Sequence, residues 1–175
     1  MTKYITEDWE NNPLFSALLR SEAYKEAGRV TCGGREALDP VNIGIIMALP
    51  GQLVPVHIDT PLFWGRTRYN LPQWLLIAVE QSGLFKDIEI RQTQGVAYLH
   101  SWVNTTRDLG AFYYYPNGTD GQSVSFPPDF NTAIVFDGST IVHGVDVWKP
   151  WIEPPELDST MELKYIGNEE WHLLK

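Results

Sequence analysis

A histidine and an aspartate stand two positions apart in VPVHIDTP, residues 54–61, at the end of a β-prone run. In a strand, residues i and i+2 point to the same side, so His57 and Asp59 aim an imidazole and a carboxylate at one point. A second apolar run, VFDGSTIVHGVDV, contains His143, which is followed by a glycine that permits close backbone approach. These three side chains predict a metal site, provided that the fold brings His143 back to the other two.

Two histidines and one carboxylate can occupy one face of a metal ion and leave three coordination positions open. This is the facial triad of non-haem iron(II) oxygenases, in which a 2-oxo acid takes two positions and dioxygen takes the third. The alternative is structural, because a histidine and an aspartate at a strand end can also hydrogen-bond loop backbone. For His143 taken alone, the alternative is a core histidine with its polar atoms satisfied.

Three motifs in order resemble the iron(II)/2-oxoglutarate-dependent oxygenases: HID at 57–59, GAFYYYPNG at 110–118 and DGSTIVHGVD at 137–146. The resemblance covers roughly residues 41–148. It implies a double-stranded β-helix, which is a jelly-roll variant, with Fe(II) as cofactor and 2-oxoglutarate as cosubstrate. It also implies a dioxygenase that hydroxylates its substrate through an iron(IV)-oxo intermediate, with His57, Asp59 and His143 as catalytic metal ligands.

The same resemblance suggests residues for the cosubstrate and reveals a departure. Tyr98 and His100 stand on one face of a predicted strand, where the family often hydrogen-bonds cosubstrate or substrate, although a packed aromatic face fits equally well. The family anchors the far carboxylate of 2-oxoglutarate with a basic residue downstream of the distal histidine, but no arginine follows His143. The remaining basic candidates lie downstream at Lys149, Lys164 and Lys175 or upstream at Arg66, Arg68, Arg91 and Arg107.

Two interpretations follow from this departure: either the anchor lies elsewhere, or the chain is a shortened form whose core lacks its last strand. The alternatives to an oxygenase are a cupin-like metal-binding jelly roll and an inactive truncated relative without cosubstrate binding. The usual cupin H-x-H is absent, because Asp59 stands where the second histidine would be. A serine hydrolase has no support, since the chain has no G-x-S-x-G segment.

The elements that must position these residues are mainly short strands. Asn12 and Pro13 predict the start of a helix that ends at Gly28, and Pro72 and Gly83 favour a second helix over a central strand. We expect strands in the ranges 42–49, 53–58, 88–91, 95–103, 111–116 and 132–148, the last hinged at 137–138, and a final hairpin around 167–168. The pattern predicts a mainly β protein with flanking helices and a jelly-roll core.

Composition bounds the remaining properties. At 175 residues the chain fits one domain, 1–175, with an N-terminal helical segment at 1–40 and a jelly-roll core at 41–175. A net charge of −9 argues against nucleic acid or an anionic membrane as partner, so a small-molecule substrate is favoured. One cysteine and an acidic N-terminus without an apolar signal core predict a cytoplasmic protein.

Several side chains beside the triad have two interpretations. Trp64, Tyr69 and Trp74 follow the HID motif, and core packing is favoured over an aromatic substrate wall. Asp137 is expected to form a turn, and Asp146 is expected to support a metal ligand.

Overall fold

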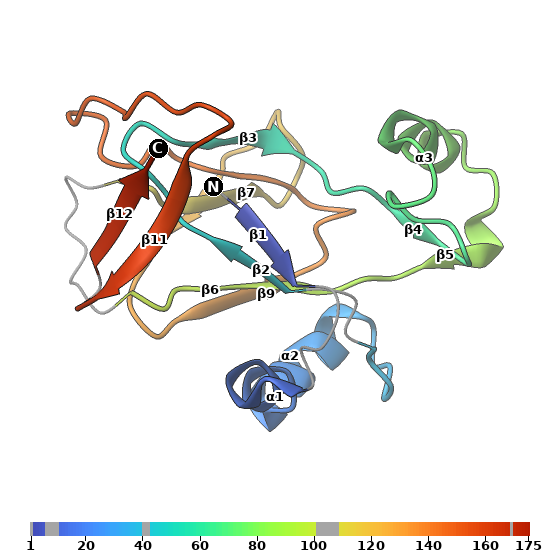
Figure 1. Cartoon of the computed structure of the whole chain (residues 1–175). Coiled ribbons are helices and arrows are strands. Elements are labelled where there is room, and N and C mark those ends of the chain that lie inside the picture. The colour runs from blue at the N-terminus through green and yellow to red at the C-terminus, as the bar shows by residue number, and fades with distance from the viewer. Residues whose placement is uncertain (1, 6–10, 40–42, 101–108, 169) are drawn as a thin grey trace.

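The computed structural model describes residues 2–5, 11–39, 43–100, 109–168 and 170–175, and this part of the chain is mainly β with three α-helices (Figure 1). All strand pairs are antiparallel. The strands are β1 (Thr2–Ile5), β2 (Ile43–Ile46), β3 (Val54–His57), β4 (Leu62–Phe63), β5 (Glu89–Ile90), β6 (Gln94–Ala97), β7 (Phe112–Tyr115), β8 (Val124–Phe126), β9 (Ala133–Phe136), β10 (Val142–Val145), β11 (Glu162–Gly167) and β12 (Glu170–Leu174).

The first predicted helix is two helices, α1 (Pro13–Leu19) and α2 (Glu22–Thr31). The helix is interrupted at Ser21, whose backbone is extended. The side-chain oxygen of Ser21 caps α2 by accepting the N–H of Tyr24 at 3.2 Å. The prediction of one helix ending at Gly28 was therefore wrong, because apolar periodicity ran through a serine that acts as an N-cap. The predicted second helix is confirmed as α3 (Gln73–Gln81).

The sheet that carries the predicted ligands has the strand order β3-β10-β7-β8. A two-stranded sheet, β6-β9, lies across from it, and α2 covers the outer face of that pair (Figure 1). The chain crosses between the two sheets repeatedly, since β6 and β9 alternate in sequence with members of the larger sheet. Residues distant in sequence therefore come together between the sheets.

The core between the two sheets is aromatic. Phe112 on β7 and Phe136 on β9 are buried, and their ring centroids lie 5.0 Å apart, which joins one sheet to the other. Tyr114 points to the same face of β7 as Phe112 and stacks on Phe126 at 6.1 Å. Tyr113 and Tyr115 pair with each other at 6.1 Å on the opposite face, as strand alternation predicts.

An arm projects from the sheets between β3 and β6 and consists of β4, α3, the 3₁₀ turn Lys86–Ile88 and β5 (Figure 1). Three of its aromatic residues face solvent: the relative exposure of Trp64 is 79% and that of Trp74 is 70%, and Tyr69 is also exposed. The prediction that these rings pack in the core was wrong. The short β4-β5 ladder and the single helix provide too little surface to cover them.

Two further pairs complete the described part. β1 pairs with β2, and β11 pairs with β12 as the predicted final hairpin, with Asn168 in the left-handed conformation at its turn. Among the residues that the structure describes, the sheets do not close into a barrel. The described helices are all too short or too polar to cross a membrane.

Candidate metal centre

His57 and His143 are direct partners across the β3-β10 ladder. Residues that oppose each other in an antiparallel pair share a face, so both imidazoles project from the same side of the sheet. Their ring centroids lie 4.3 Å apart. Between this pair and the pair Val54–Val145 the register shifts by one residue, because three steps along β3 match two along β10. The bulge contains Pro55, which has no N–H to donate to the ladder.

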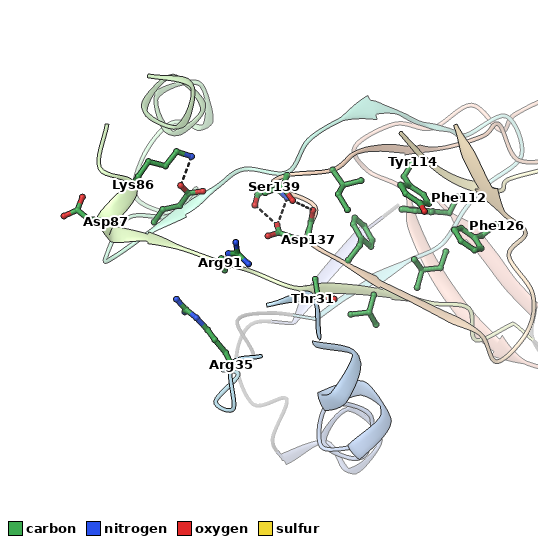
Figure 2. Close-up of a pocket in the computed structure, with 16 residues that line it drawn as sticks. Thr31, Arg35, Lys86, Asp87, Arg91, Phe112, Tyr114, Phe126, Asp137 and Ser139 are labelled. Carbon is green, nitrogen blue, oxygen red and sulfur yellow. Dashed lines mark hydrogen bonds and ion pairs between the residues drawn. The ribbon is translucent and has the colours of Figure 1, made fainter. Parts of the chain in front are cut away.

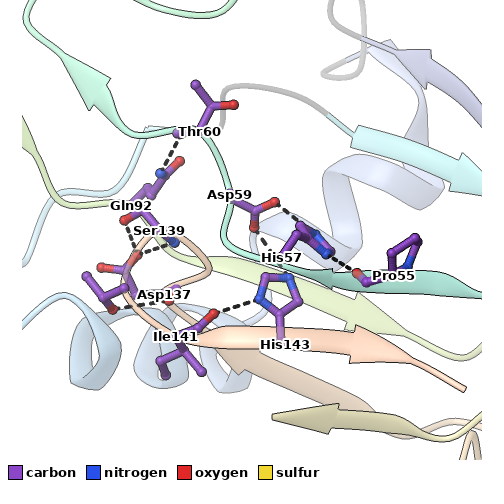
Figure 3. A network of polar contacts seen from close by, with 10 residues as sticks. Pro55, His57, Asp59, Thr60, Gln92, Asp137, Ser139, Ile141 and His143 are labelled. Carbon is purple, nitrogen blue, oxygen red and sulfur yellow. Dashed lines mark hydrogen bonds and ion pairs between the residues drawn. The ribbon is translucent and has the colours of Figure 1, made fainter. Parts of the chain in front are cut away.

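Asp59 lies just beyond the end of β3, on the same side as His57. Its Oδ1 is 3.6 Å from Nε2 of His57, and its Oδ2 is 3.7 Å from Nε2 of His143 (Figure 3). The carboxylate therefore faces the Nε2 atoms of both rings and presents one oxygen to each. The structure brings together all three predicted ligands, whose donor atoms lie within 4.8 Å of one another.

The other nitrogen of each imidazole is already engaged. Nδ1 of His57 is 2.7 Å from the carbonyl oxygen of Pro55, and Nδ1 of His143 is 2.8 Å from that of Ile141. A carbonyl oxygen can only accept, so each Nδ1 carries the proton and donates it. In the neutral rings, each Nε2 then holds a lone pair that points toward Asp59.

When both rings are neutral, this arrangement brings three hydrogen-bond acceptors together. Asp59 Oδ2 is buried and has no hydrogen-bond partner among the described residues. A buried carboxylate oxygen is costly to leave unpaired, and a cation at this point would satisfy it and both Nε2 atoms. Two atoms bonded to one ion at about 2.1 Å lie at most about 4.2 Å apart, so each of the two separations, 3.6 and 3.7 Å, is short enough for its histidine nitrogen and carboxylate oxygen to bind the same ion.

The centre has one buried wall and one accessible wall. His143 is 4% exposed, with its ring stacked on Phe112 at 5.7 Å and edge-on to Phe136 at 4.8 Å. The side chains of His57 and Asp59 retain 36% and 28% exposure. A small molecule can therefore approach from the side of His57, while the two phenylalanine rings hold His143 in a single orientation.

The turn between β9 and β10 behaves as predicted for Asp137. Its carboxylate accepts the N–H of Ser139 at 3.0 Å and the hydroxyl of Ser139 at 2.6 Å, and both residues are buried. The expected support of a metal ligand by Asp146 is absent among the described contacts. Asp146 is exposed on the outer face, near Tyr113. Burial is the main cause that raises the pKa of Tyr113, and the negative charge of Asp146 raises it further.

Tyr98 and His100 form a separate pair, with ring centroids 6.2 Å apart. The backbone N–H of Tyr98 donates to Thr132, which extends the β6-β9 ladder by one residue. Tyr98 is two residues from Val96, which opposes Ile134, so it faces the larger sheet on the same side as Gln94. Its hydroxyl oxygen is buried without a partner among the described residues, and desolvation raises the pKa of Tyr98 to about 12.

The basic residues lie in different places. Lys149 extends over the ring of Trp148 at 5.0 Å, and Lys164 is exposed on β11 opposite His172. Arg66 and Arg68 lie on the arm, and Arg107 is outside the described residues. Arg91 lines a cavity of about 1050 Å³ together with Arg35 and Thr31 near α2 (Figure 2). The cavity also reaches Phe112 and Phe136, the two rings that contact His143.

Sequence reasoning missed the groups that hold the ligands. These are the carbonyl groups of Pro55 and Ile141, and Gly138, whose carbonyl oxygen accepts the N–H of Asp59 at 2.7 Å. Every residue type has a backbone carbonyl group, so the sequence does not reveal which carbonyl groups hold the ligands. Only Gly138, which lies between two turn-forming residues, could have been recognised as part of a turn.

The chain matches no protein-family model, no curated protein and no solved structure. Its description therefore rests on the site itself: a mainly β protein with a histidine–aspartate–histidine group that can hold a metal ion.

Proposed function

We propose that this protein is an Fe(II)- and 2-oxoglutarate-dependent dioxygenase that hydroxylates a small molecule. The observation that carries the proposal is the convergence of His57 and His143 Nε2 on the carboxylate of Asp59, with both Nδ1 atoms donating to backbone carbonyls. One oxygen of that carboxylate, Oδ2, is buried and has no hydrogen-bond partner among the described residues. Two neutral imidazoles and one carboxylate suit iron(II) and leave coordination positions for other ligands.

The strand arrangement supports a jelly-roll interpretation of the fold. β3, β7, β8 and β10 form one sheet, and β6 and β9 face it through the contact of Phe136 with Phe112. Strands that alternate between two facing antiparallel sheets are typical of a jelly roll. The metal ligands then lie at the end of the sandwich where β3 and the β9–β10 turn meet.

Bound iron would supply the activation of dioxygen, and the residues of the chain have three other tasks. His57, Asp59 and His143 hold the ion; Phe112 and Phe136 exclude water from the inner side of His143. Tyr98 offers an unused donor between the sheets, which suits a carboxylate or carbonyl oxygen of a bound ligand. Tyr98 and His100 therefore remain the proposed contacts for the cosubstrate.

An anaerobic titration tests this proposal. The purified protein is titrated with Fe(II), without and then with 2-oxoglutarate, and the visible absorption band of an iron-bound oxo acid is recorded. The expected result is one Fe(II) per chain and a band that requires both Fe(II) and 2-oxoglutarate. Iron binding without the band would favour a metal-binding protein that uses no 2-oxoglutarate, and absence of iron binding would overturn the metal centre.

A matched pair of variants makes the titration specific. Asp59→Asn keeps the size of the side chain but removes its negative charge, so the iron affinity and the band should both be lost. Asp120→Asn changes an exposed carboxylate in the turn that precedes β8 and should leave both unchanged.

A further inference from the structure

The turn between β9 and β10, residues 137–141, contacts two of the three proposed ligands. At Gly138 the carbonyl oxygen accepts the N–H of Asp59 at 2.7 Å. Three residues further on, the carbonyl oxygen of Ile141 accepts Nδ1–H of His143 at 2.8 Å (Figure 3). One short segment thus fixes the backbone of Asp59 and the ring orientation of His143.

The turn itself is firmly braced. The carboxylate of Asp137 accepts both the N–H and the hydroxyl of Ser139, and the carbonyl oxygen of Asp137 accepts the N–H groups of Thr140 and Ile141 at 3.3 and 3.2 Å. Residues 136–139 are all buried. A buried segment with its polar groups satisfied internally has little freedom to shift, so it can act as a rigid support.

Gly138 provides a seat for the Asp59 carboxylate. A Cβ atom at this position would overlap Asp59 Oδ2 and would lie 2.9 Å from Asp59 Cγ and 2.9 Å from Cδ of Gln94. The backbone of Gly138 is not in the left-handed region, so other residue types could adopt its conformation. The requirement for glycine is therefore spatial: the carboxylate occupies the volume that a side chain would fill.

We infer that Gly138 is a positioning residue of the metal centre and that the turn 137–141 is the support that sets the spacing between Asp59 and His143. This inference rests on the proposed metal site. Gly138 acts through Asp59: the absence of a side chain at position 138 lets the carboxylate lie where one oxygen faces each Nε2 atom, and Gln94 borders the same space. A ligand held in this way needs no reorganisation when an ion binds.

The first test is Gly138→Ala with Gly121→Ala as its control. Gly121 also lies in a turn outside the left-handed region, but a Cβ there would meet its neighbours only at ordinary distances of 3.4 Å or more. The affinity for Co(II), a spectroscopic substitute for Fe(II), is measured by titration of the visible absorption of the ion. We expect Gly138→Ala to weaken binding by about 10- to 100-fold and to change the shape of the spectrum. Gly121→Ala should do neither.

The second test separates positioning from general damage to the fold. Gly138→Ala, Asp59→Ala and the double variant form a cycle in which urea unfolding of the metal-free proteins is measured. If the added methyl group acts against the carboxylate, Gly138→Ala should destabilise the Asp59→Ala protein less than the wild type. In the metal titration, Gly138→Ala should have no further effect once Asp59 is gone.

A conservative variant probes the brace. Asp137→Asn keeps an oxygen that can accept from Ser139 and should retain most of the Co(II) affinity, whereas Asp137→Ala should lose it together with the turn. The inference is wrong if wild-type protein binds Co(II) and Gly138→Ala binds it equally well, or if the two substitutions in the cycle are additive. If wild-type protein binds no metal, the proposed function falls and the positioning role falls with it, even where the unfolding cycle shows coupling.

Discussion

His57 and His143 are Cα partners across the β3-β10 ladder, and their rings lie 4.3 Å apart although the residues are distant in sequence. The pairing register of β3 and β10 is therefore enough to bring the two histidines of the site together. Asp59 is then added from the end of the same strand as His57, and its oxygens reach both rings.

Asp59→Asn should have opposite effects on metal affinity and on the stability of the metal-free protein. The substitution removes the anionic ligand, so the Fe(II) affinity should fall by at least about 100-fold, more than is typical when a partner of a ligand is changed. It also removes a half-buried charge, one oxygen of which has no hydrogen-bond partner among the described residues, so the metal-free protein should be equally or more stable in urea unfolding. A large loss of stability without metal would show that Asp59 serves mainly to hold the fold.

Tyr98→Phe should leave the thermal midpoint unchanged or raise it, because the hydroxyl that it removes is buried without a partner among the described residues. If the hydroxyl contacts the cosubstrate, the same variant should bind 2-oxoglutarate more weakly in the Fe(II) titration. A variant that is clearly less stable, with the affinity for 2-oxoglutarate unchanged, would contradict the proposed role.

The pH dependence of stability should also report on Tyr98. Burial raises its pKa to about 12 in the folded protein, above the usual value of about 10, so the unfolded chain loses this proton first. The contribution is therefore fully present below about pH 10 and is lost as the pH rises toward 12. Urea unfolding at a series of alkaline pH values should show a smaller decline for Tyr98→Phe than for the wild type.

Gly144→Ala should destabilise the protein, because a Cβ at this position on β10 would lie 2.6 Å from the hydroxyl oxygen of Tyr113 and 2.9 Å from the carbonyl oxygen of Val54. Overpacking of this kind typically costs about 1–3 kcal/mol in the free energy of unfolding. Tyr113→Ala should recover part of that loss when it is combined with Gly144→Ala. If the effects of Gly144→Ala and Tyr113→Ala on the free energy of unfolding are strictly additive, the added methyl group does not act against Tyr113.

Aromatic residues of the core and of the arm should differ sharply in their contribution to stability. Phe112→Ala removes a ring that is 2% exposed and should cost about 3–5 kcal/mol. Trp64→Ala and Trp74→Ala remove exposed rings and should change the free energy of unfolding by no more than about 0.5 kcal/mol. Equal losses at all three positions, measured by urea unfolding, would mean that the arm is packed in solution.

The ligands could be predicted from the sequence because histidine and aspartate are rare in apolar strands and their spacing places them on one face. The strands around them followed from alternation and turn residues, as the β9–β10 hinge at 137–138 and the β11-β12 hairpin show. The position of the break between α1 and α2 did not follow, because Ser21 is compatible with either a helix interior or a cap until its backbone is known.

Exposure of the arm could not be predicted for a different reason. Trp64 and Trp74 have the composition of core residues, and whether a tryptophan is covered depends on which elements pack over it, not on its neighbours in sequence. The support of the site was hidden in the same way. The seat for Asp59 at Gly138 comes from chain that lies almost eighty residues downstream, and it becomes visible only when both segments are in place.

Because His57 lies opposite His143, an ion bound to both side chains also links two strands that are distant in sequence. An ion held by these two side chains closes a chain segment of 86 residues, the difference between their positions. In the chain-entropy model, a permanent covalent link across a loop of this length restricts the unfolded state by about 4–5 kcal/mol. A metal ion differs because its bonds do not persist in the unfolded chain: it stabilises the folded state only while it is bound there, and chelation removes that stabilisation.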